Sequence, residues 1–183
     1  MKKAFFVFMA VLLCFVILAG CSASGYSNLL LFTDRLSEIS GKEYSLEDYS
    51  VSVGSRFLLM QREGCDVLIR GEEDERSNLR QVSVTLSKVD EKGKGKTVSD
   101  SDALFYKSCV QQVIYAFTLF NEEKSRVLAE KILPSKGADL LRTGELTADA
   151  DNFSLVYYSN GLCCRFTVTD TYLEKSESTC KPG

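Results

Sequence analysis

The dipeptide Asn160-Gly161 limits what this chain can fold into more than any other local feature. It separates segments 153–159 and 162–169, in which apolar side chains alternate with polar ones. Asn-Gly favours the type I′ turn, whose two central residues both need a positive φ angle. The pattern predicts a β-hairpin with its apolar side chains on the core face. The predicted register pairs Ser159 with Leu162, Tyr157 with Cys164, Leu155 with Phe166 and Phe153 with Val168.

Three more strands are predicted ahead of residue 90. Segments 57–61 and 65–70 are joined by a turn that contains Gly64, and a third strand covers 80–86. In the second of these strands, alternate residues point to opposite faces. The inward set is Cys65, Val67 and Ile69, and the outward set is Asp66, Leu68 and Arg70.

A helix is predicted before these strands. Asn28 or Ser27 serves as its N-cap, and Gly41 supplies the left-handed residue that ends it. Its apolar stripe consists of Leu29, Phe32, Leu36 and Ile39. Beside a membrane such a stripe can also dip into lipid, but packing on the protein's own sheet is the interpretation that we favour.

Two further helices are predicted between the strands. The first begins at Ser99 or Ser101, ends at Phe120, and has a broad apolar face that suits the centre of a core. The second is capped by Asn121 and ends at Leu133. The order helix, three strands, two helices, two strands predicts an α+β domain. We expect an antiparallel sheet of about five strands with helices on one face.

The residue types that are missing limit the chemistry. The chain has no histidine, which excludes a Ser-His or Cys-His dyad and a His-ligated zinc site. The acidic strings 72–75 and 149–152 do not match a calcium loop. Gly95-Lys96-Thr97 does not match a phosphate-binding loop, because Asp90 stands where that motif needs its first glycine. We therefore expect no catalytic residue, metal or cofactor.

The first residues have the pattern of an export signal. Lys2 and Lys3 precede an apolar run over 4–19, and a basic start, an apolar run and a small-residue cleavage site define a secretory signal. The end of this segment, Leu18-Ala19-Gly20-Cys21, resembles the lipobox of bacterial lipoproteins. The resemblance implies that signal peptidase II cuts before Cys21 and that Cys21 carries diacylglycerol, with a further acyl chain on its amine. Two or more acyl chains anchor a protein stably to a bilayer.

Two other interpretations of the leader stay open. The apolar run is close to the length that spans a membrane, so it suits an uncleaved helix as well. An ordinary secretory signal would leave Cys21 as a plain thiol. With the lipoprotein interpretation, the chain divides into a signal peptide at 1–20, a lipidated tether at 21–27, one α+β domain at 28–173 and a polar tail at 174–183. We expect it on the extracytoplasmic face of the cell membrane.

Net charge and the lack of catalytic spacing favour a binding module of unknown ligand. The formal charge of the chain is −3, and it falls further when Lys2 and Lys3 are removed, so nucleic acid is not an expected partner. The membrane, through the lipid on Cys21, and an envelope protein are the expected partners. The candidate binding face is the sheet face that the helices leave open. It carries Tyr158, Arg165, Arg80 and Asp66.

Alternative functions are an envelope hydrolase that uses carboxylates or a lysine-activated serine, and a thiol-redox accessory role at Cys163-Cys164. Neighbouring residues of a strand point to opposite faces, so these two cysteines are poor partners for each other. If one disulfide forms, we expect it between Cys163 and Cys180. Cys109 and Cys164 are expected to act as small apolar core residues.

Overall fold

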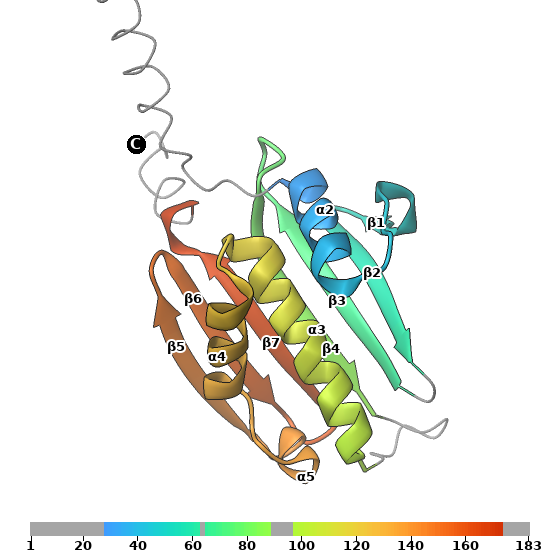
Figure 1. Cartoon of the computed structure of the whole chain (residues 1–183), viewed down its shortest axis with the longest axis vertical. Helices are drawn as coiled ribbons and strands as arrows, with labels where there is room; N and C mark the ends of the chain where they lie inside the picture. The colour runs from blue at the N-terminus through green and yellow to red at the C-terminus, as the bar shows by residue number, and fades with distance from the viewer. Residues whose placement is uncertain (1–27, 63–64, 89–96, 174–183) are drawn as a thin grey trace, which may run out of the picture.

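The computed structural model describes residues 28–62, 65–88 and 97–173. The predicted signal peptide, the tether with Cys21, most of the Gly95-Lys96-Thr97 segment and the tail with Cys180 lie outside these ranges. Within the described ranges the chain forms one sheet and one layer of helices (Figure 1).

The elements fall into two successive runs, each with helix first and strands after. The first run is α2 (Leu29–Ser40), the 3₁₀ helix η1 (Leu46–Asp48), β1 (Ser50–Ser52), β2 (Ser55–Arg62), β3 (Cys65–Glu73) and β4 (Leu79–Ser87). The second run is α3 (Asp100–Thr118), α4 (Glu122–Ile132), α5 (Gly137–Leu140), β5 (Gly144–Ala150), β6 (Phe153–Ser159) and β7 (Cys163–Asp170).

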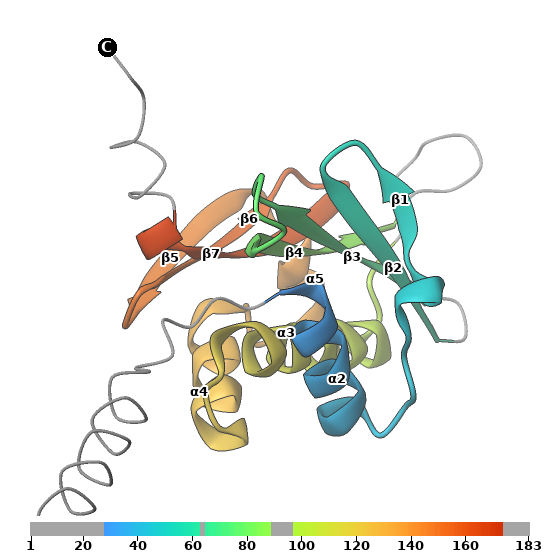
Figure 2. The same ribbon diagram turned by 90° about the horizontal axis from the view of Figure 1, so that it is seen from above.

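The sheet is antiparallel throughout, with seven strands in the order β1-β2-β3-β4-β7-β6-β5. The last strands of the two runs, β4 and β7, pair at its centre, with Val84 opposite Phe166. Helices α2, α3 and α4 lie on the same face of the sheet, and the opposite face is left open (Figure 2). The predicted α+β class with helices on one face is confirmed. The sheet has seven strands where about five were expected, because the two outermost strands, β1 and β5, were not predicted.

The helix termini follow the predicted capping residues. The Asn28 side chain accepts a hydrogen bond of 2.8 Å from the Leu31 amide, and Gly41 ends α2 at a φ of 65°. Ser99 caps α3 in a reciprocal capping box with Asp102, and Asn121 caps α4. Such caps satisfy amides that lack a partner inside the helix.

The core lies between the helices and the covered sheet face. Leu29, Phe32 and Leu36 of the predicted α2 stripe are buried, so this stripe packs on the sheet as expected. The inward residues predicted for β3, Cys65, Val67 and Ile69, are buried as well. Tyr106 of α3 is fully buried, and its hydroxyl donates a hydrogen bond of 3.0 Å to the Val84 carbonyl. That bond satisfies the phenol in an apolar environment.

The β6–β7 hairpin corrects the predicted register and turn. Tyr157 lies opposite Phe166 rather than Cys164, and Leu155 opposite Val168, a shift of two residues. Gly161 has a positive φ of 90°, but Asn160 is not among the residues with positive φ, so the turn is not type I′. The Asn160 side chain instead accepts hydrogen bonds of 3.0 Å from the Leu162 and Cys163 amides. These bonds favour a longer turn, and a shift of two keeps every side chain on its predicted face.

Candidate functional site

The helix layer leaves one face of the sheet uncovered (Figure 2). Its middle is built from small hydroxyl side chains that are half-buried or buried between their neighbours. They are Ser83, Thr85, Thr167, Thr169 and Ser154. Hydroxyls can both donate and accept hydrogen bonds, so this face is polar without carrying a dense charge.

Strand register aligns one continuous line of side chains across this face, which we call the cross-strand row. Its members, in order from β2 to β5, are Leu59, Leu68, Thr85, Arg165, Tyr158 and Glu145. Neighbouring strands lie about 4.8 Å apart, so the row is about 24 Å long. It joins an apolar end at β2 and β3 to a polar and aromatic end at β7, β6 and β5.

Tyr158 and Arg165 are direct cross-strand neighbours in the row. The Tyr158 side chain is 46% exposed, and Arg165 is exposed too. Within the described ranges, no ion pair or side-chain hydrogen bond involves the Arg165 guanidinium. Both groups are therefore available to a ligand, and they are the part of the predicted binding face that the structure brings together.

Arg80 and Asp66 lie apart from this pair. The Arg80 guanidinium is 3.5 Å from a Glu72 carboxylate oxygen, whereas Asp66 accepts a hydrogen bond of 3.1 Å from the Gln61 side-chain amide. Asp66 and Glu72 are at opposite ends of β3, about 20 Å apart at the rise of an extended strand. The four predicted residues therefore do not form one compact site.

A polar network beside the row was not foreseen. The Arg70 guanidinium donates to the Ser55 hydroxyl at 3.2 and 3.1 Å, pairs with Glu72 at 3.1 Å and lies 5.6 Å from the centre of the Phe57 ring. These contacts hold Arg70 in place. Counting only partners in the part of the chain that the structure describes, the open-face arginine whose charge stays free is therefore Arg165.

The apolar end of the row opens into a hollow of about 460 Å³ along the outer edge of β2. Leu59 and Leu68 belong both to the row and to this hollow. Acidic side chains from the segment before β1, Glu43 and Asp48, line its other side. β1 pairs only with Ser55–Phe57 of β2, which is why the edge next to Leu58 and Leu59 is left open. The unbroken apolar runs 57–60 in β2 and 67–69 in β3 were a signal for this exposed apolar end, because successive residues of a strand point to opposite faces.

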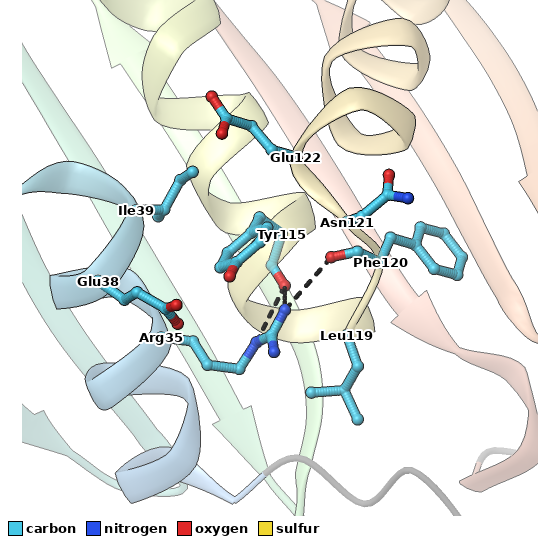
Figure 3. Close-up of a pocket in the computed structure, with 8 residues that line it drawn as sticks. All are labelled: Arg35, Glu38, Ile39, Tyr115, Leu119, Phe120, Asn121 and Glu122. Carbon is cyan, nitrogen blue, oxygen red and sulfur yellow. Dashed lines mark hydrogen bonds between the residues drawn. The ribbon is translucent and has the colours of Figure 1, made fainter.

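A second hollow, of about 550 Å³, lies among the helices (Figure 3). At its floor the Arg35 guanidinium donates to the Tyr115 carbonyl at 2.8 and 3.3 Å and to the Phe120 carbonyl at 3.3 Å. The same group lies 4.2 Å from the centre of the Tyr115 ring. Carbonyls at the end of a helix lack partners inside it. Arg35 therefore ties α2 to the end of α3 and is already occupied.

The cysteines of the described ranges are free thiols. Cys163 is half-buried, whereas Cys164 is fully buried on the opposite face. Burial raises the pKa of Cys164 to about 11, of Cys65 to about 11 and of Cys109 to about 12. A thiol reacts as the thiolate, so these three are poor nucleophiles at neutral pH. The predicted bridge from Cys163 to Cys180 involves a residue outside the described ranges and stays a prediction.

The described residues contain no cluster of histidine, cysteine or acidic side chains suited to a metal ion. None of the helices in the described ranges is long and apolar enough to span a bilayer. The chain matches no protein-family model, no curated protein and no solved structure.

Proposed function

We propose that this protein is a lipid-anchored extracytoplasmic lipoprotein that binds an envelope protein through the cross-strand row. The anchor is supported by the lipobox-like Leu18-Ala19-Gly20-Cys21. The observation that carries the binding proposal is the alignment of two exposed residues, Tyr158 and Arg165, in one row with Leu59 and Leu68. Tyrosine and arginine are enriched among the residues that dominate protein interfaces.

The chemistry of the row points to a partner with two features. An apolar side chain of the partner would enter the hollow beside Leu59 and Leu68, where it removes apolar surface from water. A carboxylate or a set of backbone carbonyls would accept the hydrogen bonds of Arg165, whose guanidinium donates in a planar fork. Tyr158 supplies a flat contact surface with few rotatable bonds next to that fork.

Photo-cross-linking in intact cells tests the binding surface. Benzoylphenylalanine in place of Tyr158 is expected to yield one defined protein adduct. The substitution Arg165→Glu, which reverses the charge beside it, should abolish this adduct. A matched probe in place of Val127, which is exposed on α4, should not yield it. Arg126→Glu, also on α4, should leave the adduct at position 158 intact. An adduct that survives Arg165→Glu, or that forms equally from position 127, would overturn the proposal.

The anchor has its own test. Metabolic labelling with an alkyne fatty acid is expected to mark the wild-type chain and not Cys21→Ala, and only the labelled chain should stay with the membrane after a carbonate wash. Labelling of the Cys21→Ala variant, or unlabelled wild type in the soluble fraction, would contradict the anchor.

A further inference from the structure

Three leucines are exposed at one end of the helix layer, and we call them the leucine patch. Leu30 and Leu31 lie in the first turn of α2 and are 55% and 38% exposed, and Leu119 follows α3 and is 41% exposed. None of them belongs to the buried stripe that packs on the sheet. Leu119 also has a φ of 60°, a left-handed conformation that costs a residue with a Cβ free energy.

The two parts of the patch lie at the same end of the molecule. The Arg35 guanidinium reaches the Phe120 carbonyl, next to Leu119. Leu31 lies one helical turn before Arg35 on the same face of α2. Leu119 lines the helix hollow at its rim, and Figure 3 shows its side chain on the side toward the end of the layer at which α2 begins.

The chain enters the domain beside this patch. Asn28 caps α2 and forms a β-bridge with Asn78. This bridge places the entry point of the chain beside the turn that joins β3 to β4. Cys21 stands seven residues before Asn28 in the sequence. A segment of that length spans at most about 24 Å, which is less than the thickness of the bilayer core of about 30 Å. An anchor at Cys21 would therefore hold the end that carries Leu30 and Leu31 next to the lipid.

We infer that the leucine patch contacts the bilayer and orients the domain with the start of α2 toward the membrane; this inference rests on the proposed anchor. Charged residues of both signs lie close to these leucines in the sequence, so the contact is apolar and does not depend on anionic lipid. They are Asp34, Arg35, Glu122, Glu123 and Lys124. Three partly exposed leucines bind weakly alone. A short tether keeps them at a high effective concentration near the lipid, so weak contact is sufficient.

The absence of tryptophan from the chain provides a clean test. Leu31→Trp, Leu119→Trp and Leu162→Trp each introduce one fluorophore at an exposed leucine. Leu162 is the matched control, because it is 46% exposed and lies in the β6–β7 turn at the opposite end of the sheet. The full acylated chain is purified in detergent and reconstituted into phosphatidylcholine vesicles with or without brominated acyl chains. Circular dichroism checks that each variant keeps the fold.

The expected result is blue-shifted emission and quenching by brominated lipid for Leu31→Trp and Leu119→Trp, with neither change for Leu162→Trp. Protein that floats with the vesicles but shows no quenching at positions 31 and 119 overturns the inference and leaves the anchor intact. Equal quenching at all three positions also overturns it. A blue shift that grows with protein concentration in the absence of vesicles assigns the patch to a second copy of the chain instead. A chain without acyl groups, seen by mass, refutes the anchor itself.

Discussion

The ammonium of Lys88 lies 3.0 Å from a carboxylate oxygen of Asp102, and their side chains are only 14% and 13% exposed. This ion pair joins the end of β4 to the first turn of α3, across a segment outside the described ranges. The same carboxylate accepts a hydrogen bond of 3.1 Å from the Ser99 amide. Partial burial alone would raise the pKa of Asp102. Hydrogen bonds from Lys88 and Ser99 outweigh that effect and hold the pKa below its ordinary value.

The depressed pKa of Asp102 predicts a loss of stability in acid. A carboxyl whose pKa is lower in the folded state stabilises the fold above its unfolded pKa of about 3.9 and loses that contribution as the pH falls through the folded value. Asp102→Asn should cost about 2 kcal/mol at pH 7, and the gap to wild type should close below about pH 3.9. Urea unfolding at pH 7, 5 and 3 measures this. Asp34→Asn, at an exposed site, is the control. A gap that stays constant with pH would contradict the prediction.

Arg35 is predicted to stabilise the junction of α2 with α3. Arg35→Gln removes the charged fork that serves the Tyr115 and Phe120 carbonyls and should lower the free energy of unfolding by about 1–3 kcal/mol. Denaturant titration measures the loss. Arg126→Gln removes two exposed ion pairs on α4 and should change stability little, because exposed pairs contribute little. Equal losses from the two variants would refute the capping role of Arg35.

The left-handed conformation of Leu119 predicts an unusual response to glycine. Leu104 is exposed in the interior of α3, so Leu104→Gly should cost about 1 kcal/mol. Leu119→Gly also raises the conformational entropy of the unfolded chain. It releases strain of about 1–2 kcal/mol in the folded state, however, so it should be clearly less destabilising. Paired thermal unfolding measures the difference. Leu119→Gly as costly as Leu104→Gly would mean that the position carries no strain.

Thiol accessibility is predicted to separate the adjacent cysteines. In the folded protein a polar maleimide should label Cys163, and it should label Cys65, Cys109 and Cys164 only after denaturation, because these three are buried. Mass spectrometry of peptides measures the labelling. Labelling of this peptide in Cys164→Ala can come only from Cys163. The matched control, Cys163→Ser, should leave the peptide unlabelled in the folded state. Rapid labelling of Cys164 in the folded state would restore the thiol-redox alternative.

Local patterns predicted the helix layer well. The caps at Asn28, Ser99 and Asn121 depend on hydrogen bonds within one turn, so the sequence alone identified Asn121 and narrowed each of the other two to a pair of candidates. The faces of β3 and β4 follow from the two-residue period of a strand. These features need no knowledge of the distant chain.

The edge strands and the register of the sheet could not be predicted from such local patterns. β5 is almost wholly exposed and has only Leu146 and two alanines on the side that faces the core, so its apolar signal is weak. β1 has three residues, which are too few for an alternating pattern to be recognised. The register of β6 with β7 was wrong by two residues because such a shift leaves every apolar side chain on the same face, so burial does not discriminate between the two pairings.

The sequence predicted which residues lie on the open face, but not which of them lie close together. Strand period alone was enough to place Tyr158 and Arg165 on the open side, but their pairing depends on the register of the hairpin. Arg80 and Asp66 share that face, yet their separation depends on how β3 pairs with its neighbours. The contribution of Leu59 and Leu68 depends on the short length of β1, which leaves the hollow beside them open.

The pairing of β4 with β7 determines when the domain can be completed. β4 is finished at Ser87, but its inner edge finds a partner only when β7 has been made, about 80 residues later. Until then a row of unpaired backbone groups beside Val82, Val84 and Leu86 is a template for pairing with another chain. A nascent chain therefore stays prone to aggregation until β7 has been made. Any truncation that removes β7 takes away the middle of the sheet rather than its margin.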